Sequence, residues 1–300
     1  MTGGGAARLA LGTAALGDLS GVDGTAEAEA TVRAAVAAGV RWFDTSPWYG
    51  LGAAEQRLGR ALAADADDAV SVSTKVGYLV AADGGVDLAV GRGAQDFGAE
   101  ATLRSVEASV RRLGGHRIDT VLIHDPDDHE RAALDGAYPA LHQLRADGVI
   151  RAIGVGMNRT AMLTRFVRDT DIDVVLVAGR YSLLDGEAAE ELLPLCRQRG
   201  VRVMVGGVFN SGILADPRPG ALDDYRPAEP ARLARARSMA RICAAYGVPL
   251  AAAALQFPGR HPAVTQVLMG PRSRTELAAN LVHWQRAIPA GLWNELATLA

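Results

Sequence analysis

The feature that most constrains this chain is a repeated alternation of short apolar segments with helical segments. There are eight such short segments, and several of them are rich in β-branched residues, as expected for strands that are buried on both faces of a parallel sheet. Eight such units in 300 residues predict an α/β fold of the closed (β/α)₈ type, a TIM barrel, formed by one domain over residues 1–300. The predicted strands span residues 8–12, 40–44, 70–75, 118–124, 150–154, 174–177, 201–205 and 266–269.

The alternative fold is a doubly wound open sheet. That fold needs a glycine-rich fingerprint directly after an early strand. The nearest match, at residues 154–159, lacks the third glycine and lies in the middle of the chain. Close packing of the backbone explains this match equally well. Residues 77–99 and 206–230 are expected to form long loops, and residues 187–199 one helix.

The charge and composition exclude several classes of protein. The net charge is -3, and no basic run or polybasic amphipathic stretch suggests a nucleic acid or a membrane surface as a partner. The longest uncharged apolar run, residues 248–258, is too short to span a bilayer. No basic region precedes the apolar residues 9–11, so a cytoplasmic location is expected. We also expect a monomer or a weak homo-oligomer. Cys196 and Cys243 lie in helical patterns and are predicted to be small core residues.

Titratable residues end three successive predicted strands. Asp44, Lys75 and His124 occupy these ends, where the active site of a barrel enzyme lies. Neighbouring strands are about 5 Å apart, so the three side chains can converge. Tyr49 follows the second strand in a loop that contains proline and glycine. A structural ion pair would explain Asp44 and Lys75, but it would leave Tyr49 and His124 without a role.

Proton transfer during a hydride transfer uses all four residues. An unperturbed tyrosine needs about 4 kcal/mol to ionise near neutrality. The ammonium of Lys75 can supply much of this by stabilising the phenolate, and Asp44 would keep the lysine charged. His124 would donate to the substrate oxygen or orient it. The hydride itself must come from a cofactor.

A metal-dependent barrel hydrolase is a rival interpretation of the acidic and histidine cluster at residues 124–129. Such hydrolases usually carry a His-x-His pair on an early strand, and none of the six histidines has that spacing. The residues after His124 more simply form a solvated helix start. We therefore predict no metal.

Three local motifs carry a resemblance to a known family. They are FDTSPWYG at 43–50, STKVG at 73–77 and IHDPD at 123–127. Over its whole length the chain resembles the aldo-keto reductases. It is most similar to the branch that contains L-fucose, D-threo-aldose and L-galactose 1-dehydrogenases and pyridoxal 4-dehydrogenase, through segments 154–158, 179–185, 207–212 and 254–258. The resemblance implies a catalytic tetrad of Asp44, Tyr49, Lys75 and His124.

The same resemblance implies NAD or NADP as the cofactor. Residues 270–276 would hold its adenosine end, because a glycine-rich turn that leads into a helix is a ready anion site. Gly270, Arg272 and Asn280 are the predicted contacts, although a solvated loop explains them too. Glu276 would lie near the ribose, where a carboxylate favours a free 2′-hydroxyl.

The nicotinamide contacts depart from the family pattern. Gly156 and Met157 stand where many members have Ser-Asn, and Ala178 stands where a glutamine is usual. Gly206 replaces the aromatic residue that stacks on the nicotinamide. Other residues are therefore predicted to contact the nicotinamide in their place, although each could equally be a packing or ion-pair residue. These substitutes are Asn158, Arg180 and Phe209.

The branch implies oxidation of the anomeric hydroxyl of an aldose such as L-fucose, or of the hemiacetal of pyridoxal, to a lactone. Trp48 would offer a flat face to such a ring, and Asp125 and Asn210 would bind its hydroxyls. With 5% aromatic residues, the chain has few side chains for an apolar mouth. The alternatives are an NADPH-dependent carbonyl reductase of a biosynthetic pathway and a non-enzymatic cofactor sensor. A sensor has no need of an intact tetrad.

Overall fold

The computed structural model describes residues 7–63, 70–81 and 93–299, and a closed barrel of parallel strands forms its centre. The order around the barrel is β1-β10-β7-β6-β5-β4-β3-β2. The (β/α)₈ fold is confirmed, and the open sheet is excluded because β1 pairs with both β2 and β10. The strands are β1 (Arg8–Gly12), β2 (Trp42–Asp44), β3 (Ser71–Val76), β4 (Thr120–His124), β5 (Ala152–Met157), β6 (Val174–Ala178), β7 (Arg202–Gly206) and β10 (Val264–Met269).

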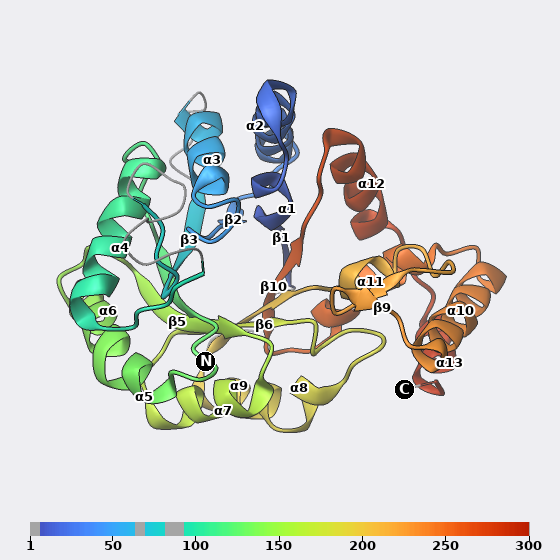
Figure 1. Cartoon of the computed structure of the whole chain (residues 1–300). Coiled ribbons are helices and arrows are strands. Elements are labelled where there is room, and N and C mark those ends of the chain that lie inside the picture. Colours follow the sequence, from blue (N-terminus) through green and yellow to red (C-terminus); the bar gives the residue numbers. More distant parts are fainter. Residues whose placement is uncertain (1–6, 64–69, 82–92, 300) are drawn as a thin grey trace.

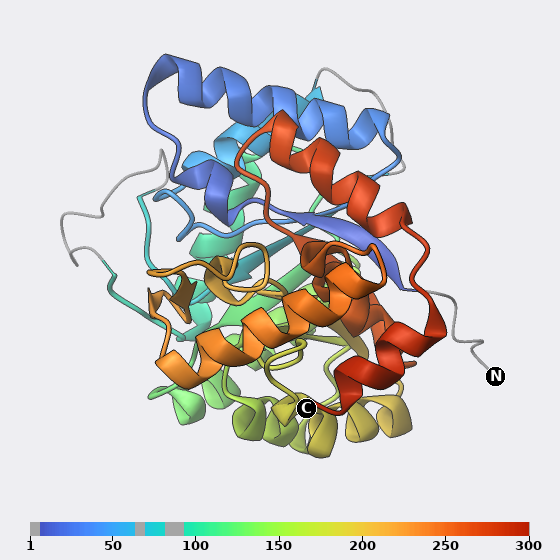
Figure 2. The same cartoon turned by 90° about the vertical axis from the view of Figure 1, so that its right-hand side faces the viewer.

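The helices lie outside the strands (Figure 1 and Figure 2). α10 and α13 pack together beside α11, apart from the helices α2 to α4. Short 3-10 and π segments complete the layer: η1 (Ala133–Ala137), η2 (Asn210–Gly212) and η3 (Phe257–Arg260). The α-helices are α1 (Ala14–Gly17), α2 (Gly21–Ala37), α3 (Ala53–Ala63), α4 (Ala99–Arg112), α5 (Glu130–Ala132), α6 (Tyr138–Ala146), α7 (Thr160–Asp169), α8 (Glu187–Glu190), α9 (Leu192–Arg199), α10 (Pro230–Ala245), α11 (Leu250–Gln256), α12 (Arg274–Gln285) and α13 (Ala290–Ala297).

The main apolar core lies between the strands and the helices. It contains fully buried side chains from both layers, such as Val121 and Leu163. Each such burial contributes about 1.5–3 kcal/mol of hydrophobic stabilisation. Cys196 belongs to this core and Cys243 to a second core under α10 and α11, which confirms the prediction made for both. Burial raises the pKa of the two thiols to about 12 and about 11.

Three predicted segments differ in detail. The helix expected at 187–199 is broken after α8, because Pro194 has no N–H to bond with the carbonyl of Glu190. The loop expected at 206–230 contains a hairpin, β8 (Leu222–Asp223) with β9 (Arg226–Pro227), whose two turn residues have positive φ. In the excursion at 77–99, Tyr78 and Gln95 form an antiparallel bridge, and residues 82–92 lie outside the described ranges.

Within the described ranges, no single helix is long and apolar enough to cross a membrane. The segment Pro230–Ala245 passes the length and composition test only together with Leu250–Arg260, and the two are bent by 102° at the break.

Candidate active site

A buried ion pair at the ends of β2 and β3 forms the base of the site. The Nζ of Lys75 lies 2.6 Å from Oδ2 of Asp44 and donates to the carbonyl of Thr45 at 2.8 Å. The hydroxyl of Ser73 donates to Oδ1 of Asp44 at 2.8 Å. Lys75 is 1% exposed, so an ammonium without these partners would be costly. The sequence-based pairing of Asp44 with Lys75 is therefore confirmed.

Tyr49 lies over this ion pair. Nζ of Lys75 is 4.6 Å from the centroid of the phenol ring. Burial nevertheless raises the pKa of Tyr49 above its ordinary value; Lys75 acts to lower it, and the Asp44 carboxylate opposes Lys75. The expected lowering of the pKa by Lys75 is therefore outweighed in the protein without a cofactor, chiefly by the desolvation of the phenol and further by the charge of Asp44. Tyr49 is a neutral phenol and hence a proton donor.

A close backbone contact sets the position of Tyr49. A Cβ on Gly17, at the end of α1, would lie 2.7 Å from the carbonyl carbon of Tyr49. A Cβ on Gly50 would lie 2.2 Å from the carbonyl oxygen of Gly17, and Gly50 also has a φ of +60°. The guanidinium of Arg57 donates to the carbonyls of Gly17 and Leu19 at 3.1 and 2.7 Å. This contact joins residues far apart in the sequence, so the sequence offered no signal for it.

His124 completes the tetrad at the end of β4. Its Nδ1 lies 3.1 Å from the hydroxyl oxygen of Ser46, and its Nε2 lies 3.5 Å from Oδ2 of Asp125. Burial, with the charge of Lys75, holds the pKa of His124 well below 6.5. The imidazole is therefore neutral at physiological pH, with one donor and one acceptor nitrogen.

An aromatic wall borders the tetrad on the side of β3. Trp48 stacks on Tyr78, with ring centroids 4.7 Å apart and planes inclined by 19°. Tyr78 meets His124 edge-on at 5.1 Å, and Tyr49 does so at 5.9 Å. One face of Trp48 is thus covered by Tyr78. Sequence reasoning missed Tyr78, although its place three residues after Lys75 in the loop beyond β3 was the available signal.

Asp125 directs a carboxylate to the same rim. Its φ is +44°, a left-handed conformation that is uncommon for a residue other than glycine. The side chain of Gln95 donates to its carbonyl at 3.1 Å, which ties the bridge at Tyr78 to this rim. Burial and the nearby charge of Asp127 raise the pKa of Asp125 to about 6.

The acidic residues after Asp125 face an arginine. Arg159 lies 2.7 Å from Asp127 and 3.9 Å from Asp128. The described residues contain no group of three His, Cys, Asp or Glu side chains that could hold a metal ion.

The predicted nicotinamide contacts lie at the ends of β5, β6 and β7 in different environments. Arg180 faces the carboxylates of Asp224, Asp185 and Glu187 at 3.0 to 3.9 Å, so it is an ion-pair residue in this structure. Phe209 is partly buried between the two main apolar cores, and Asn158 is exposed. Their roles toward a cofactor remain predictions.

Asn210 is buried in the loop after β7, and only one of its two side-chain polar atoms has a hydrogen-bond partner among the described residues. Its amide donates to the carbonyl of Gly179 at 3.3 Å. Its Oδ1 is buried and has no partner among the described residues. A buried acceptor of this kind is normally paired, so Asn210 is suited to receive a donor from a bound molecule.

The predicted adenosine segment forms the N-terminus of α12. Oε2 of Glu276 accepts the backbone N–H of Arg272 at 2.8 Å, and Ser273 caps the helix by accepting the N–H of Glu276 at 3.2 Å. Glu276 thus places a carboxylate against the loop that precedes α12. Asn280 is buried one turn further along the helix, and a Cβ on Gly270 would meet nothing within 4 Å.

These features fit a dinucleotide. The space beside Gly270 offers an open approach, and the orphaned Oδ1 of Asn210 offers a free acceptor. The N–H groups at the start of α12 are already taken, because Arg272 donates to Glu276, Arg274 to Glu27 and Glu276 to Ser273. The arrangement is compatible with NAD(P), and the position of its adenosine end at α12 remains a prediction.

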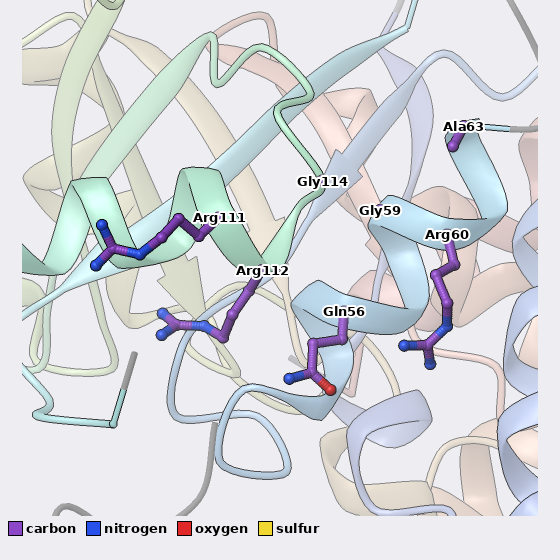
Figure 3. A pocket seen from close by; sticks show the side chains of 7 residues that line it. All are labelled: Gln56, Gly59, Arg60, Ala63, Arg111, Arg112 and Gly114. Carbon is purple, nitrogen blue, oxygen red and sulfur yellow. The ribbon is translucent and has the colours of Figure 1, made fainter. Parts of the chain in front are cut away.

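A hollow of about 660 Å³ lies outside the barrel between α3 and α4, and Figure 3 shows its side chains. Two of the three guanidiniums in its lining are already paired: Arg112 lies 2.6 Å from Glu55, and Arg60 lies 2.7 Å from Glu29. The hollow holds none of the tetrad. Its lining is Gln56, Gly59, Arg60, Ala63, Arg111, Arg112 and Gly114.

Known proteins are similar to this chain in sequence and in fold. Residues 8–299 match the model of the Aldo/keto reductase family. D-threo-aldose 1-dehydrogenase from a Pseudomonas species is 40% identical, covering 96% of this chain and 92% of that protein. Pyridoxal 4-dehydrogenase from Microbacterium luteolum is 38% identical with the same coverage. The structure of an aldo-keto reductase from Bacillus halodurans superposes with a TM-score of 0.81 at 24% identity, covering 98% of this chain and 92% of that one.

Proposed function

We propose that this chain, which belongs to the aldo/keto reductase family and is an NAD(P)-dependent oxidoreductase, oxidises the anomeric hydroxyl of an aldose to a lactone. The observation that carries the proposal is the tetrad geometry. Lys75 is paired with Asp44 at 2.6 Å beneath the ring of Tyr49, and His124 lies edge-on to the same ring.

When bound, NAD(P) supplies the hydride acceptor. The residues of the chain bind the hydroxyl oxygen of the substrate and transfer its proton. Tyr49 and His124 both lie at the rim, where they would form hydrogen bonds with the hydroxyl on the reacting carbon. Oxidation needs the phenolate of Tyr49 as proton acceptor, and burial raises the pKa of that phenol. The rate of oxidation should therefore rise with pH, whereas a reduction would use the neutral phenol as donor.

The substrate class follows from the polar mouth and from the relatives. Trp48 provides an aromatic edge, and the carboxylate of Asp125 and the free Oδ1 of Asn210 can accept hydrogen bonds from hydroxyls. The two relatives above are named for D-threo-aldoses and for pyridoxal. An aldose such as L-fucose, or the hemiacetal of pyridoxal, fits these groups.

The cofactor preference follows from Glu276. Its carboxylate accepts the N–H of Arg272 and would lie near the ribose of a bound cofactor. A second anion at that place would be repelled. We therefore propose that NAD is used at least as well as NADP.

A carbonyl reductase that uses NADPH is the second candidate. The observation in its favour is the neutral phenol of Tyr49, which is the protonation state that a reduction requires. We further propose that residues 1–300 act as one domain, in the cytoplasm, as a monomer or weak homo-oligomer.

A substrate panel tests the proposal. L-Fucose, L-galactose, D-threo-aldoses and pyridoxal would each be offered with NAD and with NADP, and the reduced nicotinamide would be followed by its absorbance. Oxidation of a sugar or of pyridoxal is expected. Efficient reduction of simple aldehydes or ketones, with no oxidation of any sugar or pyridoxal, would instead support the carbonyl reductase.

A further inference from the structure

One buried contact at the tetrad is not used by the chemistry above. The hydroxyl oxygen of Ser46 lies 3.1 Å from Nδ1 of His124. Ser46 is 0% exposed and His124 is 8% exposed, so water does not compete strongly for either atom. Ser46 lies two residues after Asp44, in the loop that leads from β2 to Tyr49.

The hydrogen-bond partners of Ser46 define where its proton goes. Its oxygen accepts the backbone N–H of Trp48 at 3.1 Å. A serine hydroxyl has one proton to donate in addition to its acceptor sites. Within the described part of the chain, Nδ1 of His124 is the acceptor that this hydroxyl faces. A proton on Nδ1 would leave the buried Ser46 hydroxyl without an acceptor for its own proton.

The surroundings of the other ring nitrogen, Nε2, also favour a proton on Nε2 over one on Nδ1. Nε2 lies 3.5 Å from Oδ2 of Asp125. The ring is neutral, so one of its nitrogens carries the proton. An unprotonated Nε2 would place a lone pair opposite the carboxylate oxygen of Asp125, whereas a proton on Nε2 gives an attractive contact.

We propose that Ser46 is a positioning residue that fixes His124 as the Nε2–H tautomer. Its hydroxyl donates to Nδ1, so the ring presents an N–H donor, and not a lone pair, to the reacting oxygen at the rim. Tyr78 and Tyr49 hold the ring edge-on and limit its rotation. The tautomer itself does not depend on the proposed function, but its effect on the rate does.

The tautomer is measured by ¹⁵N NMR on histidine-labelled protein, since protonated and unprotonated ring nitrogens have well-separated shifts. His124→Asn assigns the signal. The wild type should show Nε2 protonated and Nδ1 unprotonated at neutral pH. In Ser46→Ala the population of the Nδ1–H tautomer should rise about tenfold relative to Nε2–H, because one hydrogen bond is lost. Ser46→Thr, which keeps the hydroxyl, should retain the wild-type tautomer.

Thr120→Val is the matched control. Thr120 lies on the same strand as His124, and its buried hydroxyl has no partner among the described residues. This variant should change neither the tautomer nor kcat. Ser46→Ala should lower kcat about tenfold with little change in KM, since a donor to the reacting oxygen acts mainly in the transition state.

Two results overturn the inference. One is a wild-type His124 protonated at Nδ1, which needs no variant to be observed. The other is a Ser46→Ala protein with the wild-type tautomer. A shifted tautomer with unchanged kcat would uphold the role of Ser46 in setting the tautomer. It would instead overturn the donor role of His124 in the proposed function.

Discussion

Substitutions of Asp44 and of Lys75 should have strongly non-additive effects on the free energy of unfolding. Both side chains are almost fully buried, and Nζ and Oδ2 are 2.6 Å apart. Lys75→Met leaves the carboxylate with only Ser73 as its side-chain partner, and Asp44→Asn leaves the ammonium with the carbonyl of Thr45. Removing one partner of a buried pair costs about 3–5 kcal/mol, because the other charge stays buried. Each single variant should lose that much free energy of unfolding.

The double variant Asp44→Asn with Lys75→Met leaves no uncompensated charge. It should therefore be no less stable than either single variant, which corresponds to a coupling energy of at least about 3 kcal/mol. Urea unfolding followed by circular dichroism measures all four proteins. Losses that simply add in the double variant would refute the reasoning.

The pair of Arg60 with Glu29 is a control for this cycle. Its atoms are 2.7 Å apart, but the Arg60 side chain is 52% exposed. The equivalent cycle with Arg60→Met and Glu29→Gln should give a coupling below about 1 kcal/mol, because water screens the charges.

Three further predictions concern ligands. Trp48→Ala should raise KM for a sugar or pyridoxal more than it lowers kcat, because an aromatic platform binds ground and transition states alike; the opposite pattern in steady-state kinetics would exclude that role. KM should rise as the pH falls through about 6, because protonation of Asp125 removes an anionic acceptor, and Asp125→Asn should abolish this inflection; an inflection that persists would assign it elsewhere. Glu276→Gln should raise kcat/KM for NADP relative to NAD about tenfold, since one repulsive charge is removed, and an unchanged ratio would place Glu276 away from the ribose.

The barrel could be predicted from the sequence because eight short and mostly apolar segments alternate with helical segments. The rim residues Asp44, Lys75 and His124 could be predicted for the same reason, since parallel strands bring their carboxyl ends together. The sequence did not predict short elements inside the expected loops. The hairpin β8–β9, for example, depends on two non-glycine residues with positive φ.

The missed parts of the site depend on contacts between distant segments. The contact of Gly17 with Gly50 joins the end of α1 to the loop after β2. Gly50 lies in the motif at 43–50, but nothing in the sequence pairs it with Gly17. Tyr78 reaches His124 from the loop after β3. The pKa of Tyr49 was predicted in the wrong direction because the sequence shows a neighbouring lysine but does not show the extent of burial.

The most direct test of the central claim is Tyr49→Phe. Phenylalanine keeps the ring over Lys75 and removes only the hydroxyl. Binding of NAD or NADP, measured by protein fluorescence, should be nearly unchanged. In the same preparation kcat for the sugar or pyridoxal should fall at least about a hundredfold, because the proton carrier is lost. A variant that binds the cofactor and keeps more than about a tenth of the wild-type kcat would contradict the role of Tyr49 in proton transfer.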